Sequence, residues 1–96
     1  MQKMDRYFVY IMTNKHNTVL YIGVTGNLGE RVSAHMSGAG GQFTAKYKIT
    51  KLVYYEAFER IDEAIEREKR LKRWKRVWKN ELIEKLNPSW EEITTW

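Results

Sequence analysis

Residues 7–24 read YFVYIMTNKHNTVLYIGV and contain two short runs of β-branched and aromatic side chains. Such side chains favour extended strands. The runs, Tyr7–Thr13 and Val19–Val24, are separated by the polar sequence NKHN, which is typical of a turn between strands. We therefore predict an antiparallel β-hairpin, with Tyr10 and Tyr21 on its paired strands.

The rest of the chain predicts one further strand and several helices. The strand is indicated by the apolar and aromatic residues of Lys51–Phe58. The predicted helices are a short one that begins around Asn27-Leu28-Gly29 and ends before the loop 37–41, a longer one from an N-cap at Asp62 to about Arg73, and one from about Lys75 to Leu86. Asn87-Pro88 stops the last helix, and we expect the tail, residues 89–96, to fold back on the domain.

Length and composition limit the class of protein. The chain has 96 residues with a single proline, and its apolar residues are spread from end to end, which predicts one domain over residues 1–96. The absence of cysteine excludes disulfides, cysteine-ligated zinc and a thiolate nucleophile. The N-terminus does not resemble an export signal, and no apolar run approaches the roughly twenty residues that cross a bilayer. We therefore expect a cytoplasmic protein with no membrane partner.

Positive charge is concentrated in Arg67–Lys79. The chain has a formal net charge of +5, and this run alone holds eight basic residues and one acidic residue. A solvated helix surface usually mixes both signs, whereas this run is nearly of one sign and is interrupted by apolar and aromatic residues. We therefore favour phosphate contact over an ordinary solvated surface and predict a nucleic-acid partner. The candidate contacts are Lys69, Arg70, Lys72, Arg73, Lys75, Arg76 and Lys79.

Glu68 stands where the helical pattern predicts an apolar residue. The residues that keep the three-and-four spacing of a buried helix stripe are Ile61, Ala64, Ile65, Leu71 and Trp74. Glu68 falls within that stripe, and a half-buried carboxylate is costly unless it is paired or bound to a cation. Two explanations remain open, an ion pair with Lys72 four residues on and a role as a metal ligand.

Arg31 and His35 are four residues apart on the predicted short helix and therefore share one face. A guanidinium beside an imidazole is suited to binding a phosphate. A histidine at a helix end is also favoured by the helix dipole, and strand tyrosines are ordinarily packing residues, so each residue alone decides little. Gly23 and Thr25 give a flexible strand exit nearby, which fits either a ligand approaching the backbone or an ordinary turn.

Taken in order, these residues resemble the GIY-YIG nuclease family, and in particular its small single-domain URI-type branch. Phe8-Val9-Tyr10 stands at the first motif, with Phe8 and Val9 in place of its Gly and Ile, and Tyr21-Ile22-Gly23 is the second motif without change. The block that follows is similar at Gly23-Val24-Thr25, Asn27-Leu28 and Arg31 through His35. Further similarities extend along the chain at Phe43-Thr44, Tyr47, 52–56, Ala64, Arg67-Glu68, Leu71-Lys72, 74–76, Lys79, Leu82-Ile83 and 87–90.

The resemblance implies a mixed α/β fold with a three-stranded antiparallel sheet flanked by helices, which agrees with the order of elements predicted above. It also implies that Glu68 would hold one divalent cation, Mg²⁺ or Mn²⁺. Tyr10 and Tyr21 would flank the scissile phosphate, and Tyr21 is our candidate for the general base. Arg31 would stabilise transition-state charge, and His35 would donate or relay a proton.

The resemblance also implies supporting roles for two residues. Lys72 would orient Glu68 or touch phosphate, and Asn87 would anchor the last helix beside the site. Together these roles describe a metal-dependent endonuclease, a hydrolase that cuts DNA in repair or recombination.

Two alternatives to a DNA endonuclease stay open. A non-catalytic nucleic-acid-binding module would keep the basic run, but the presence of every candidate catalytic group favours the enzyme. RNA is the other alternative, because phosphate contacts carry no base identity. Substrate choice would come from the basic helix or from a partner protein, so we expect structure-directed or weakly sequence-selective cleavage.

Overall fold

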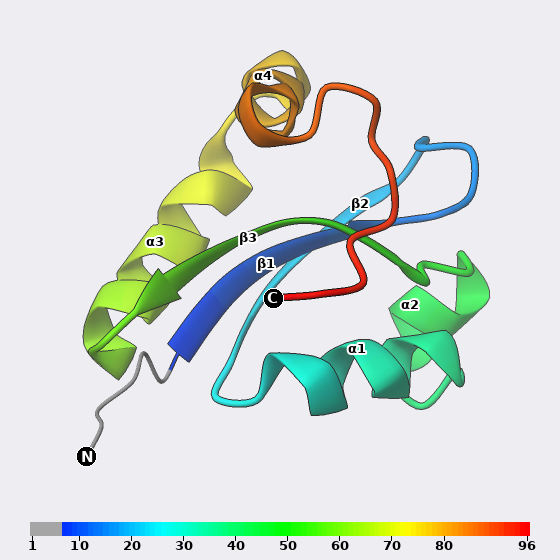
Figure 1. Cartoon of the computed structure of the whole chain (residues 1–96), viewed down its shortest axis with the longest axis horizontal. Coiled ribbons are helices and arrows are strands. Elements are labelled where there is room, and N and C mark those ends of the chain that lie inside the picture. Colours follow the sequence, from blue (N-terminus) through cyan, green and yellow to red (C-terminus); the bar gives the residue numbers. More distant parts are fainter. Residues whose placement is uncertain (1–6) are drawn as a thin grey trace.

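A three-stranded antiparallel sheet in the order β2-β1-β3 organises the structure. The computed structural model describes residues 7–96 (Figure 1). Its elements are β1 Tyr7–Thr13, β2 Leu20–Thr25, α1 Leu28–Met36, α2 Gln42–Lys46, β3 Lys51–Phe58, α3 Ile61–Arg73 and α4 Arg76–Leu86. The predicted mixed α/β fold, with a three-stranded antiparallel sheet and flanking helices, is confirmed.

The β1–β2 hairpin is closed by Asn14 at the start of its loop. The Asn14 Oδ1 atom accepts hydrogen bonds from the backbone N–H groups of Thr18, at 2.8 Å, and Val19, at 3.2 Å. Asparagine side chains often satisfy turn backbone in this way. The register that results places Tyr10 of β1 directly opposite Gly23 of β2.

The two faces of the sheet are covered by different helices, because side chains alternate along a strand. Val9 and Ile11 of β1 belong to a core cluster with Leu71 of α3 and apolar residues of α4. Tyr10 and Met12 point the other way and cluster with apolar residues of α1. Figure 1 shows α3 and α4 on one side of the sheet and α1 and α2 on the other.

The C-terminal tail folds back on the domain, as predicted. Trp90 is 9% exposed and donates its indole N–H to Glu84 at 2.9 Å. The backbone N–H of Ile93 donates to the Leu52 carbonyl of β3 at 2.8 Å. The tail therefore covers part of the edge that β3 would otherwise present to solvent.

One helix is absent from the sequence prediction. The sequence predicts that strand Lys51–Phe58 follows the loop directly, but α2 intervenes and that prediction is wrong. At five residues, α2 is too short to show helical periodicity. Its N-cap is Gly41, and glycine has no side chain that could cap the helix and so indicate its start in the sequence.

The start and the buried face of α3 also differ from the prediction. The N-cap is Arg60 and not Asp62, whose carboxylate lies in the first turn and pairs with Arg60 at 3.0 Å. Ile61 and Ile65 were expected to be buried, but they are 43% and 37% exposed. The sheet covers a narrower stripe of α3 than the spacing predicts, centred on residues such as the fully buried Ala64. Strand β2 lies one residue later than predicted.

Within residues 7–96, no helix combines the length and the apolar character needed to cross a membrane.

Candidate active site at the edge of the sheet

Tyr10 lies in the space that Gly23 leaves open. An ideal Cβ on Gly23 would lie 2.5 Å from the Tyr10 hydroxyl oxygen and 2.6 Å from its Cζ. Gly23 is not among the glycines with positive φ, so the need for glycine here is one of space and not of backbone conformation. The Tyr10 ring can therefore extend across β2, which is an edge strand, and bring its hydroxyl group to the edge of the sheet.

The Tyr10 hydroxyl group is paired with His35 of α1. The distance from the hydroxyl oxygen to His35 Nε2 is 3.1 Å, and both residues are 1% exposed. Burial, followed by the neighbouring Tyr21, raises the pKa of Tyr10. Burial, followed by the charge of Arg31, lowers the pKa of His35. At neutral pH the pair is therefore a protonated phenol and a neutral imidazole. His35 is thus a buried histidine with a side-chain partner, and not a surface histidine stabilised by the helix dipole.

Tyr21 completes an aromatic group at this edge. Its ring centroid lies 5.3 Å from that of His35 and 6.2 Å from that of Tyr10. Unlike these two residues, Tyr21 keeps part of its surface exposed. Tyr21 is therefore the tyrosine of the pair that a substrate can reach.

Arg31 and Glu68 contribute the charges of the site. Arg31 is exposed on α1, and its positive charge acts on both Tyr10 and His35. Glu68 comes from α3, and its negative charge is also felt at the Tyr10 hydroxyl group. The structure thus brings together the predicted catalytic residues from β1, β2, α1 and α3.

Glu68 forms the ion pair that its spacing predicts. Its carboxylate is 2.5 Å from the Lys72 ammonium group, and the two side chains are 13% and 54% exposed. The mostly buried carboxylate therefore has a partner, but that partner is a solvent-exposed lysine. This geometry is compatible with both explanations left open by the sequence.

The residues at this edge fit one kind of metal ion. Within the described part of the chain, no three His, Cys, Asp or Glu side chains gather into a potential metal site. This donor set does not suit an ion that needs an all-protein cage. It does suit Mg²⁺ or Mn²⁺, because Mg²⁺ keeps several waters and is often held by one or two carboxylates together with substrate phosphate. Glu68 is the residue that would hold it.

Most of the predicted nucleic-acid contacts lie on exposed parts of α3 and the turn into α4. The exposed residues are Lys69, Arg70, Lys72, Arg73, Lys75 and Arg76. Lys79 is partly buried, and burial, followed by the charge of Arg76, lowers its pKa.

Arg76 has a structural role that the sequence did not indicate. Its guanidinium group donates to the carbonyl oxygens of Asn17, at 2.7 Å, and Thr18, at 3.1 Å, and to the side chain of Asn80. These bonds hold the start of α4 against the hairpin loop. They account for Arg76 without a phosphate contact.

The supporting residues predicted from the sequence also have structural partners. Thr25 Oγ1 accepts from the backbone N–H of Asn27 at 3.1 Å and so shapes the turn into α1. The Asn87 side chain donates to the Val53 carbonyl of β3 at 3.0 Å and to the Glu91 carbonyl at 2.9 Å. Asn87 therefore joins the end of α4 to both the sheet and the tail.

Sequence reasoning missed three residues beside the site. Gly40 passes so close to His35 that a Cβ would overlap the imidazole Nδ1 atom, which is buried and has no hydrogen-bond partner among the described residues. Phe43 and Tyr47 of the α2 region continue the aromatic group, with Phe43 at 6.4 Å from Tyr21 between ring centroids. Gly40 lies within the predicted loop 37–41, and the sequence marked Phe43 and Tyr47 only as positions similar to the GIY-YIG family, with no role assigned.

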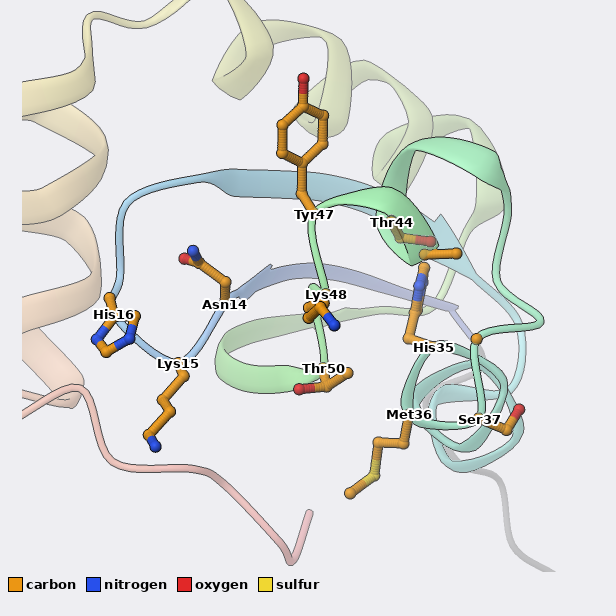
Figure 2. A pocket seen from close by; sticks show the side chains of 12 residues that line it. Asn14, Lys15, His16, His35, Met36, Ser37, Thr44, Tyr47, Lys48 and Thr50 are labelled. Carbon is orange, nitrogen blue, oxygen red and sulfur yellow. The ribbon is translucent and has the colours of Figure 1, made fainter.

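A hollow of about 560 Å³ opens on the side of His35 where α1, α2 and the hairpin loop meet. Figure 2 shows it, with His35 and Thr44 at one end and Lys15 and His16 at the other. None of its lining residues is acidic. Because Lys15 and Lys48 line it, the hollow is a positively charged space adjacent to the candidate active site.

Comparisons with known proteins show the family and agree with the fold. A family model described as the GIY-YIG catalytic domain matches residues 6–81. A UPF0213 protein of Staphylococcus haemolyticus is 37% identical over 84% of this chain and 98% of its own length. A UPF0213 protein of Clostridium perfringens is 42% identical over 79% of this chain and 81% of its own length. A solution NMR structure of a UPF0213 protein from Bacillus halodurans is 29% identical, covers 90% of each chain and gives a TM-score of 0.57.

Proposed function

This chain belongs to the GIY-YIG family, and from that premise we propose that it is a divalent-metal-dependent endonuclease that hydrolyses DNA phosphodiester bonds. The observation that carries the proposal is the convergence of the tyrosine pair, Arg31, His35 and Glu68 at one edge of the sheet. They come from four different elements, and packing alone does not require a guanidinium, an imidazole and a carboxylate to meet around two phenols.

Arg31 is the residue that binds the scissile phosphate. It is exposed on α1 and carries a fixed positive charge next to the phenol groups. Attack on a phosphodiester adds negative charge to the phosphoryl oxygens, and a guanidinium positioned there stabilises that charge.

Tyr21 is the residue that takes the proton from the attacking water. Tyr10 has a raised pKa and a hydrogen-bond partner in His35, so it retains its proton and acts as a donor. Tyr21 is the more exposed phenol, so it is the one that an attacking water can reach. Water oxygen then bonds to phosphorus, the bond to the 3′-oxygen breaks, and no covalent enzyme intermediate forms.

His35 holds Tyr10 in position and provides a path for a proton through the hydrogen bond between them. Glu68 would hold Mg²⁺ or Mn²⁺, which supplies positive charge to stabilise the leaving oxygen. Lys72 lies four residues after Glu68, and its side chain is 54% exposed. It would release the Glu68 carboxylate to the metal ion or share the carboxylate with that ion.

The exposed basic residues of α3 and the turn that follows would bind the DNA backbone. Such contacts fix the position of the duplex or strand without reading its bases. We therefore propose structure-directed or weakly sequence-selective cleavage, as in DNA repair or recombination in the cytoplasm. A partner protein would supply further targeting, and RNA is the alternative substrate.

The test is cleavage of labelled single-stranded, duplex, flapped and branched DNA with Mg²⁺, Mn²⁺ or EDTA. We expect metal-dependent cleavage by the native chain and none by Glu68→Gln or Tyr21→Phe. Glu66→Gln is the matched control, because Glu66 is on the same helix but is 74% exposed and only loosely paired with Arg70, at 3.7 Å. Glu66→Gln should cleave at the native rate.

A second function is favoured by one observation, the existing ion pair between Glu68 and Lys72. A carboxylate used only in that pair would belong to a non-catalytic nucleic-acid-binding module. DNA binding with no cleavage under any metal condition would support this module and contradict the nuclease. Loss of the fold in Glu68→Gln would point to a structural role for the pair.

A further inference from the structure

A row of aromatic rings leads outwards from the candidate active site. The ring centroid of Phe43 lies 6.4 Å from that of Tyr21, and the ring centroid of Tyr47 lies 4.8 Å from that of Phe43. Phe43 lies on α2 and Tyr47 is its C-cap residue, so both rings come from this helix and its end. The row begins at the tyrosine that would face the scissile phosphate.

The outer two rings are exposed to solvent. Phe43 is 48% exposed and Tyr47 is 40% exposed, whereas the inner residues Tyr10 and His35 are 1% exposed. Mutual packing of Phe43 and Tyr47 explains part of their position, but it does not explain why two adjacent rings leave so much apolar surface in water. Exposed apolar groups that lie together beside a site commonly mark a binding surface.

The surroundings of these rings are positively charged. The Lys46 ammonium group lies 5.3 Å from the centroid of the Tyr47 ring. Tyr47 also lines the hollow beside His35, together with Lys15 and Lys48 and with no acidic residue. Aromatic rings beside a positively charged groove are the combination that proteins use to bind single-stranded nucleic acid, with bases on the rings and phosphates in the groove.

We propose that Phe43 and Tyr47 form a stacking platform for unpaired bases next to the phosphate that is cut, with the adjoining phosphates near Lys15 and Lys48. This inference rests on the proposed function, because it takes the candidate active site as the place of cleavage. A base inside a duplex is covered on both faces by its neighbours and cannot stack on a protein ring. The platform therefore selects strands that are single-stranded, flapped or bulged beside the cut.

The test measures base stacking directly and without cleavage. Glu68→Gln protein is mixed with oligonucleotides that carry 2-aminopurine at successive positions, because the fluorescence of this base falls when it stacks. We expect quenching at one or two adjacent positions and its loss in the added Phe43→Leu, Tyr47→Leu double variant. The Kd for single-stranded DNA should rise on the order of tenfold per ring removed, and the Kd for duplex DNA should not change.

Trp78→Leu is the matched control, because Trp78 is also 48% exposed but lies on α4, which packs on the opposite face of the sheet. It should leave the quenching at its native position and depth. If the leucine variants do not fold, as judged by circular dichroism, Phe43→Tyr and Tyr47→Phe provide the second comparison, and both should retain quenching.

The outcomes separate the platform from the nuclease. Quenching that depends on Phe43 and Tyr47 in a chain that never cleaves would support the platform and contradict the proposed function. Three results would each overturn the platform. The first is cleavage by the native chain with quenching that the leucine substitutions do not change. The others are an equal loss of single-strand and duplex binding in the leucine variants, and no DNA binding at all.

Discussion

Replacing Gly23 by alanine tests whether Tyr10 lies across β2. The new Cβ would be 2.5, 2.6 and 2.9 Å from the hydroxyl oxygen, Cζ and Cε2 of Tyr10. Carbon atoms in contact are normally about 3.5–4.0 Å apart, so the ring must move by about 1 Å. Tyr10 is 1% exposed and is joined to His35, so its ring can move only by displacing neighbours.

The expected cost can be worked from this overlap. Adding a methyl group to a filled core costs about 1–3 kcal/mol. In a domain of this size, each kcal/mol lowers the melting temperature by about 4–8 °C, so Gly23→Ala should melt roughly 5–20 °C below the native chain. The same displacement lengthens the 3.1 Å contact between Tyr10 and His35. A misplacement of about 1 Å in a catalytic group can cost about 100-fold in rate, which is the loss we expect for cleavage.

Thermal unfolding by circular dichroism and single-turnover cleavage, measured where the variant remains folded, give the two readouts. Gly29→Ala is the control. Gly29 lies in α1, and a Cβ there would be 3.4 Å from Trp96 Cζ2, which is an ordinary contact distance. Alanine is favoured over glycine in a helix by about 0.5–1 kcal/mol, so this control should melt at or slightly above the native temperature and cleave normally. A Gly23→Ala chain with native melting and native cleavage would refute the position assigned to Tyr10.

Three further predictions concern residues around the site. The folded state lowers the pKa of His35, so near and below the ordinary histidine pKa of 6.5 the unfolded chain binds more protons than the folded chain. The free energy of unfolding should therefore fall as the pH drops below 6.5. Denaturant unfolding measured from pH 7 to 5.5 should show less of this loss in His35→Gln than in His16→Gln. Arg76→Ala should release the hairpin loop and so lower the melting temperature, and it should leave the salt dependence of DNA binding unchanged. Arg73→Ala should reduce the slope of log K against log salt concentration by about one and leave the melting temperature unchanged. Gly40→Ala should displace the His35 ring and reduce cleavage while DNA binding persists, and an unaltered cleavage rate would contradict that close contact.

The strands were predictable because their pattern depends on neighbouring residues. β1 and β3 have the bounds that the sequence predicts, and the hairpin between β1 and β2 follows from a polar loop between two apolar runs. The candidate site residues could be named as a set because the tyrosine, arginine, histidine and glutamate positions resemble a known family in their order. The structure then supplied the distances that order alone does not contain.

The missed features depend on contacts between distant residues. The need for glycine at Gly40 arises from the imidazole of His35, and the sequence does not show that these two segments touch. The exposure of Ile65 depends on how closely the sheet approaches α3, which periodicity does not measure. The hydrogen bond from Arg76 to the Asn17 carbonyl joins residues 59 positions apart. Nothing in a run of basic residues distinguishes the arginine that binds the protein's own backbone from those that are free to bind phosphate.

Tyr10 lies on β1, the strand with neighbours on both sides, and pairs with Gly23 on one side and Tyr55 on the other. Backbone amides in such a strand exchange with deuterium only when the domain as a whole opens, whereas amides in loops exchange through local opening. A catalytic group placed there cannot be lost by fraying of a loop. The protection of the Tyr10 amide should therefore equal the free energy of global unfolding, and heating should end cleavage at the melting transition and not before it.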